Sequence, residues 1–232
     1  MKNLLLLPMM LMAACATTSG GGKGSSAPFQ GMPVVQKRQS EIQDAAKTAM
    51  DCMKVKPGET PSKGGTFAVV ADASGKLTIT PIMWDGPEPM KQCIVDAGSK
   101  ATITPLPGPS IGTLWDFVPP GEKTETPKTP DDWGVKMQPL AETMQSEAIE
   151  CGRRFLGVDF GATVDVAYYI YNDGKGYAPT IISSDAKDGS FDSCVQEIVS
   201  HTSFPKVSPA RPFGTTSRFK IGQYGETQHR KD

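Results

Sequence analysis

The chain has 232 residues and a formal net charge of −1, from 24 Lys and Arg against 25 Asp and Glu. This near-neutral balance, without a basic patch, argues against nucleic acid as a partner. The length suits one large or two small domains, and 20 prolines, 24 glycines and 7% aromatic residues predict small cores with many turns and linkers.

The first segment has the composition of an export signal. Lys2 precedes an apolar run over 4–12, which is too short to cross a bilayer of about 30 Å. Two alanines and then Cys15 follow, which resembles a bacterial lipoprotein signal, although Met12 stands where that pattern has Leu. We predict a signal peptide over 1–14 and a Cys15 that carries acyl chains such as palmitate. An ordinary cleaved secretory signal and an uncleaved buried segment are the alternatives.

Residues 15–34 are predicted to form a flexible tether. The stretch 16–28 is small, polar and glycine-rich, a composition that cannot bury enough apolar surface to fold. Its Gly-Gly-Gly-Lys-Gly run lacks the Ser/Thr spacing, preceding strand and following helix of a phosphate-binding loop. By resemblance to lipoprotein sorting rules, Ala16 after the cysteine favours the outer membrane, with the protein facing the periplasm.

The other four cysteines divide the chain into two similar parts. Cys52 and Cys93 are 41 positions apart (93 − 52), and Cys151 and Cys194 are 43 apart (194 − 151). A turn glycine follows the first cysteine by 23 positions in both parts (75 − 52 and 174 − 151). Spacing held this closely predicts a duplication.

The first repeat, over 35–118, is expected to fold as helix, strand, strand, helix, strand. Its first helix is expected to begin at a capping box formed by Ser40 and Gln43. Alternating apolar residues on either side of Gly75 predict two strands joined by a tight turn. The remaining landmarks are Pro87 and Pro89 at the start of the second helix, Gly98 at its end, and a closing strand over 111–118.

The second repeat, over 137–222, has the same order of elements. Its first helix carries Cys151 on an apolar face, and Asn172-Asp173-Gly174 is a strong hairpin turn because these residues tolerate positive φ. We expect a proline-rich linker over 119–136 and a disordered tail over 223–232. The predicted fold class is α+β, with two tandem small domains, each a three-stranded antiparallel sheet with helices on one face.

The four paired cysteines are predicted to form disulfides. Each lies on or beside the apolar face of its helix, so two helices on one sheet face would bring the sulfurs of a repeat together. An oxidising periplasm favours the bond, and duplication selects Cys52–Cys93 and Cys151–Cys194 among three connectivities. Four buried thiols that pack as small hydrophobes are the alternative. The lack of a Cys-x-x-Cys motif and the presence of only two histidines argue against redox chemistry and zinc.

No set of residues predicts catalysis, a metal site or a cofactor. His201 is expected on the surface near a helix end, and His229 lies in the polar tail. Asp185 and Asp188 fit helix-start carboxylates better than a catalytic pair or a calcium site, because helix N-termini favour negative charge. Trp84, Trp115 and Trp133 are candidate ligand platforms. Partial core burial is expected for Trp115, since it alternates with an aromatic neighbour along a strand, and the other two stay open.

The second repeat carries two cysteines, a turn and a Phe-Pro motif in a recurring order. They comprise Cys151, Asn172-Asp173-Gly174-Lys175-Gly176, Phe191, Cys194, Phe204-Pro205, Gly214 and Arg218-Phe219. This repeat resembles the AgmX/PglI C-terminal family of myxobacterial and related envelope proteins, which is itself similar to the TonB C-terminal domain. The first repeat keeps less of the pattern, namely both cysteines, Gly75-Lys76 and Phe117.

The resemblance implies a small three-stranded sheet that offers a strand edge to a partner segment, since an open edge carries unpaired N–H and C=O groups. A lipid anchor in place of a transmembrane helix leads us to expect a binding or scaffold protein and not an energy transducer. We therefore predict a non-catalytic envelope lipoprotein with a protein partner and no small-molecule substrate. The alternative is a structural or cell-wall-binding lipoprotein without a protein partner.

Overall fold

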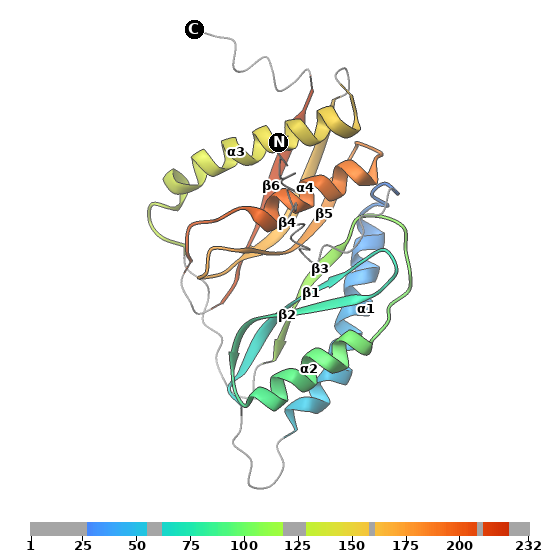
Figure 1. Ribbon diagram of the computed structural model, residues 1–232, viewed down its shortest axis with the longest axis vertical. Coiled ribbons are helices and arrows are strands. Elements are labelled where there is room, and N and C mark those ends of the chain that lie inside the picture. Colours follow the sequence, from blue (N-terminus) through green and yellow to red (C-terminus); the bar gives the residue numbers. More distant parts are fainter. Residues whose placement is uncertain (1–26, 55–61, 118–128, 158–160, 208–210, 223–232) are drawn as a thin grey trace, which may run out of the picture.

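A computed structural model describes residues 27–54, 62–117, 129–157, 161–207 and 211–222. Within these ranges the chain forms two α+β repeats in the predicted order of elements (Figure 1). The first repeat comprises α1 (Met32–Ala49), the 3₁₀ turn η1 (Met50–Met53), β1 (Gly64–Ala71), β2 (Leu77–Asp85), α2 (Glu88–Lys100) and β3 (Ile111–Phe117). The second comprises α3 (Trp133–Phe155), β4 (Ala162–Ile170), β5 (Gly176–Ser184), α4 (Gly189–His201) and β6 (Phe213–Ile221).

Several predicted segments lie outside the described residues. They are the signal peptide, Cys15 with the first part of the tether, most of the linker, and the tail over 223–232. None of the helices in the described ranges combines the length and the apolar content needed to span a membrane.

Each repeat is one antiparallel sheet whose central strand comes first in the chain. The strand orders are β2-β1-β3 and β5-β4-β6. Successive side chains of a strand point to opposite faces, so alternate apolar residues of β1 and β4 meet the helices on one face. This arrangement buries two separate cores, around Phe67, Val69 and Ile94 in the first repeat and Val164, Val166 and Val195 in the second.

The first helix begins earlier than the predicted capping box. α1 starts at Met32, after Gly31 with a φ of 95°, a conformation that glycine adopts without strain. Pro33 lies in the first turn, where its missing N–H removes no helical hydrogen bond. Ser40 is therefore an exposed residue inside the helix, and the prediction that it caps the helix is wrong.

The second repeat also begins before its expected boundary. α3 starts at Trp133, inside the segment predicted as linker. The Trp133 ring packs edge-on against Phe213, with 5.5 Å between ring centroids. This contact attaches the first turn of α3 to the start of β6, which is why the helix extends ahead of residue 137.

The sequence predicts Gly98 at the end of the second helix. In the structure Gly98 lies inside α2, before its last residue. The helix continues to Lys100, and a Cβ at position 98 would lie 2.8 Å from the Trp115 ring. That ring cannot move aside easily, because Trp115 is fully buried and its Nε1 donates to the carbonyl oxygen of Ile42 at 3.0 Å. Close packing of α2 on the indole therefore requires the glycine. Trp115 lies in the core as expected, and it is buried completely where the sequence predicted partial burial.

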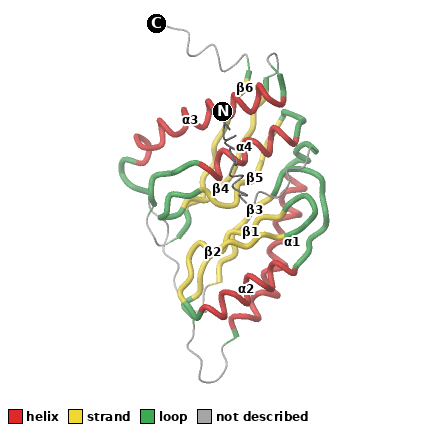
Figure 2. Tube along the Cα trace, viewed as in Figure 1, coloured by secondary structure: helices red, strands yellow, loops and turns green. Residues whose placement is uncertain are grey.

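The two repeats pack against each other through their sheets. Figure 2 shows the strands of both repeats gathered between the helices, and β5 contacts both β1 and β3. Thr66 and Ala68 point to the face of β1 that no helix of their own repeat covers, yet both are buried. The repeats therefore form one packed unit.

Candidate functional site: the outer sheet edges

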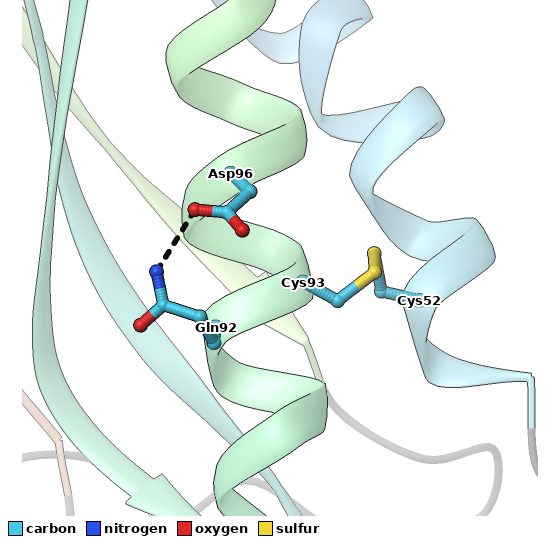
Figure 3. The surroundings of a disulfide bond; sticks show 4 residues. All are labelled: Cys52, Gln92, Cys93 and Asp96. Carbon is cyan, nitrogen blue, oxygen red and sulfur yellow. Dashed lines mark hydrogen bonds between the residues drawn. A yellow bond between two sulfur atoms is a disulfide. The ribbon is translucent and has the colours of Figure 1, made fainter.

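The four paired cysteines form the two predicted disulfides. The Cα atoms of Cys52 and Cys93 are 5.8 Å apart, and those of Cys151 and Cys194 are 6.0 Å apart. Figure 3 shows Cys52 reaching from the turn after α1 to Cys93 on α2. Each bond fastens the two helices of one repeat together, so these sulfurs are structural and leave no free thiol among the described cysteines.

The outer edge of β3, in the first repeat, is covered. The backbone N–H of Gly112 donates to Thr180 Oγ1 at 2.7 Å, and the same hydroxyl donates to the Gly112 carbonyl at 3.1 Å. From α1, Gln39 donates to the Gly112 carbonyl at 3.2 Å and Gln43 to the Leu114 carbonyl at 2.9 Å. Side chains of α1 and of the second repeat thus occupy the positions that an added strand would need.

A β-bulge in β5 brings Thr180 to this edge. Ala178 and Pro179 together lie opposite Tyr168, and Ala178 has a φ of 49°. The extra residue bends the strand and changes the direction of the following side chain. A Cβ on Gly112 would lie 2.6 Å from the Cβ of Ala178, so only glycine fits at this point of closest approach.

A second buried polar contact joins the repeats beside the first. Gln196 on α4 is 4% exposed, and its Nε2 donates to the carbonyl oxygens of Ser110 at 2.8 Å and Pro179 at 2.9 Å. Its Oε1 accepts from the Ser110 hydroxyl at 3.2 Å. A buried amide left without partners costs about 1–3 kcal/mol, so this network favours one relative position of the repeats.

The equivalent outer edge of the second repeat, on β6, is open over most of its length. The Gln145 side chain accepts from the backbone N of Lys220 at 3.2 Å and donates to its carbonyl at 2.6 Å. Even-numbered residues of β6 therefore direct their backbone groups away from β4. Among the described residues, the outward groups of Gly214, Thr216 and Arg218 have no such partner.

The two edges are counterparts in the duplication. Gly112 and Gly214 each stand five residues before the closing phenylalanine of their repeat (117 − 112 and 219 − 214). The first glycine faces Thr180, whereas the second has only the Tyr169 ring nearby. One copy of the edge therefore serves the packing between repeats, and the other copy is left exposed.

β6 is also more regular than β2, which is the other edge strand of the first sheet. It pairs with β4 residue for residue from Phe213 to Ile221 without a bulge. β2 contains Pro81 and a register shift directly after it, at Ile82. Proline and bulges are features that block strand addition at sheet edges. Since β6 has neither, its stretch from Gly214 to Arg218 is the edge best suited to pair with another chain.

An ion pair orients Arg218 on the helix-free face of β6. Its Nε and Nη2 donate to the two oxygens of Asp165 at 2.7 and 2.9 Å. These hydrogen bonds hold the pKa of Asp165 below its usual range and raise the pKa of Arg218. The paired charges keep the side chain over β4, so the Arg218 backbone remains available at the edge.

Asp192, in the first turn of α4, is fully buried. Its carboxylate accepts from the Ser184 hydroxyl at 2.6 Å and from the backbone N of Phe29 at 3.3 Å. Burial, with smaller contributions from Asp188 and Asp185, raises the pKa of Asp192 to about 6. Phe29 packs against both cores, so this carboxyl fastens the segment before α1 to the second repeat.

The other residues considered from the sequence lie apart from one another. His201 is exposed at the end of α4, and Asp188 caps that helix by accepting from backbone N–H groups of its first turn. Asp185 accepts from the backbone of β4 at 2.6 Å. The described ranges hold no group of three or more His, Cys, Asp or Glu side chains placed to bind a metal ion. Cys15 and His229 lie outside the described residues.

Sequence reasoning missed the residues that join the repeats, namely Gly112, Thr180 and Gln196. Their partners are remote in sequence, so no local pattern indicates the contacts. The sequence signals the bulge only through the longer spacing between the two cysteines of the second repeat. No family model, curated protein or solved structure matches this chain.

Proposed function

We propose that this protein is a non-catalytic lipoprotein of the cell envelope that binds an extended segment of a partner protein along the outer edge of β6. The observation that supports the proposal is the open run of backbone donors and acceptors at Gly214, Thr216 and Arg218. Strand addition at such an edge gains main-chain hydrogen bonds, each contributing about 0.5–1.5 kcal/mol net.

The sequence supports the envelope setting of this proposal. Cys15 follows a lipoprotein-like signal, and the two disulfides suit an oxidising compartment. The second repeat also resembles the AgmX/PglI C-terminal family, which is similar to the TonB C-terminal domain, and TonB-type domains offer a strand edge to a partner segment, which favours binding by strand addition. In this proposal the lipid holds the protein at the outer membrane, facing the periplasm, and the packed repeats present β6 as a rigid template.

The test compares two substitutions at one position of the edge in the full-length, membrane-anchored protein. Thr216→Pro removes an N–H that points away from β4, so the pairing within the sheet keeps its hydrogen bonds. Thr216→Val keeps the N–H and the strand propensity. Cross-linked envelopes are solubilised, the protein is recovered, and the attached proteins are identified and quantified.

The proposal predicts that one discrete protein is recovered with the wild type and with Thr216→Val, and at least about tenfold less with Thr216→Pro. Equal recovery with both variants would contradict pairing at β6. Enrichment with cell-wall sacculi alone, without a protein partner, would favour the structural or cell-wall-binding alternative.

A further inference from the structure

Two segments of the first repeat, 28–34 at the start of α1 and 104–109 before β3, contain no Asp, Glu, Lys or Arg. Each lies within a longer stretch without these residues, 24–36 and 101–115, although charged residues make up 21% of the chain. Charged side chains normally gather on protein surfaces, so a surface formed by both segments differs from the rest of the molecule.

The structure brings these two segments side by side. Val34 and Leu106 border the same small cavity, and a Cβ on Gly108 would lie 3.6 Å from the Pro28 carbonyl oxygen. Figure 1 shows the loop before β3 running beside α1. We refer to the two segments together as the uncharged patch.

The uncharged patch presents apolar side chains to the surface. Met32 is 40% exposed, and Pro33, Pro105 and Pro107 are exposed as well. Leu106 is half-buried between two of these prolines. A continuous apolar surface without charges is typical of a contact with another protein or with a membrane.

Few polar groups of the uncharged patch need water as a partner. The backbone N of Leu106 donates to the Ala73 carbonyl, and its own carbonyl accepts from Arg38, both at 3.0 Å. Arg38 is 4% exposed, so its charge stays beneath the surface. The backbone N and the hydroxyl of Thr104 donate to Glu41 at 3.2 Å. Since prolines have no N–H, moving the patch out of water leaves few donors unpaired.

The tether predicted from the sequence joins the fold at this patch. In the proposed lipoprotein Cys15 carries the acyl chains, and the 12 positions from Cys15 to Ala27 (27 − 15) span at most about 43 Å. Ala27 directly precedes Pro28, the first residue of the patch. The acyl chains would therefore hold the patch close to the bilayer, which raises the effective concentration of lipid beside it.

We propose that the uncharged patch rests on the bilayer surface, with Met32 and the neighbouring prolines at the boundary between headgroups and acyl chains. This inference rests on the lipid anchor of the proposed function. A patch without charges suits the contact, because it gains from apolar burial and needs no anionic lipid. The orientation also leaves β6 accessible, since α1 contacts β3 and β5, whereas β6 lies beyond β4 at the far margin of the second sheet.

The test uses the full-length, lipidated protein in phosphatidylcholine vesicles, with and without bromine on the acyl chains. Bromine quenches tryptophan fluorescence at short range, so a quenched tryptophan lies at the acyl region. Met32→Trp places the reporter in the patch. Met50→Trp is the matched control, because Met50 is 56% exposed and lies about 27 Å from Met32 along the helix. The wild type gives the signal of the three native tryptophans.

After subtraction of the wild-type signal, we expect bromine to quench Met32→Trp at least about twofold more strongly than Met50→Trp, and high salt to leave this difference unchanged. Equal quenching at the two positions in vesicle-bound protein would overturn the proposal. Cross-linking of position 32 to a protein in intact envelopes, in place of lipid, would assign the patch to a protein partner and overturn it as well. Wild-type protein that does not float with the vesicles would contradict the lipid anchor of the proposed function, and this inference with it.

Discussion

The contact between the repeats can be tested with a matched pair of glycine substitutions. Gly112→Ala would place a methyl group 2.6 Å from both the Cβ and the carbonyl oxygen of Ala178. These atoms belong to the backbone of β5 or are attached directly to it, so they cannot move aside as a flexible side chain could. Overpacking of this kind costs about 1–3 kcal/mol, against a gain of about 0.4–1 kcal/mol from the stiffer unfolded chain. The net expectation is a loss of roughly 1–2 kcal/mol of unfolding free energy.

Gly214→Ala is the control, because it makes the same chemical change at the equivalent position of the second repeat. Its methyl group would lie 3.3 Å from the Tyr169 ring, a side chain that can give way, and neither glycine has a positive φ. The gain of about 0.4–1 kcal/mol from the stiffer unfolded chain is opposed here only by a small shift of that ring, so we expect its stability to lie between that of the wild type and about 1 kcal/mol above it. Urea unfolding followed by tryptophan fluorescence and by far-UV circular dichroism measures both changes. Equal effects of the two substitutions would refute the close approach of β3 and β5.

The remaining predictions concern the disulfides and the buried carboxyl. Replacing Cys151 and Cys194 together by Ala opens a loop with a separation of 43 residues, which the chain-entropy model values at about 4 kcal/mol. For a cooperative unit of this size the melting temperature should fall by roughly 8–16 °C in a calorimetric scan, and a fall of only about 2 °C would contradict the structural role. The raised pKa of Asp192, about 6 against 3.8, means that the folded state holds the proton more tightly. Its contribution to stability is therefore full below pH 4 and declines as the pH rises through about 6. The unfolding free energy of Asp192→Asn, measured between pH 4 and pH 7.5, should lack that decline; parallel pH profiles for the two proteins would show that Asp192 is not the group responsible.

The duplication made much of the fold predictable. Local patterns recur at matched positions, such as the turn glycines Gly75 and Gly174, so each repeat supports the assignment of the other. The same register led to the correct pairing of the four cysteines. The start of α1 was misplaced because Ser40 has the local features of a cap, whereas Gly31 and Pro33 provide the actual start.

The open and covered edges could not be predicted from the sequence. Gly112 and Gly214 occupy equivalent positions in similar strands, and their surroundings differ because the bulge at Ala178 and the side chain of Gln39 meet only the first of them. The spacing from Cys151 to Cys194 is 43 positions, against 41 from Cys52 to Cys93. The bulge in β5 adds one of the two extra positions, and the longer loop before α4 adds the other. Such a difference in spacing does not indicate which side chain turns toward the other repeat. Contacts between residues remote in sequence, including the burial of Arg38 and Asp192, depend on that packing.

Hydrogen exchange along β6 tests the central proposal most directly. In the free protein the amides of Thr216 and Arg218 should exchange rapidly, because they point away from β4, whereas Ser217 and Phe219 should be protected by their pairing with it. Lys220 should also be protected, since its N–H donates to Gln145. With the captured partner bound, Thr216 and Arg218 should become protected to a similar degree as Ser217. If these two amides are already protected in the free protein, or remain rapid in the complex, strand pairing at the β6 edge is contradicted.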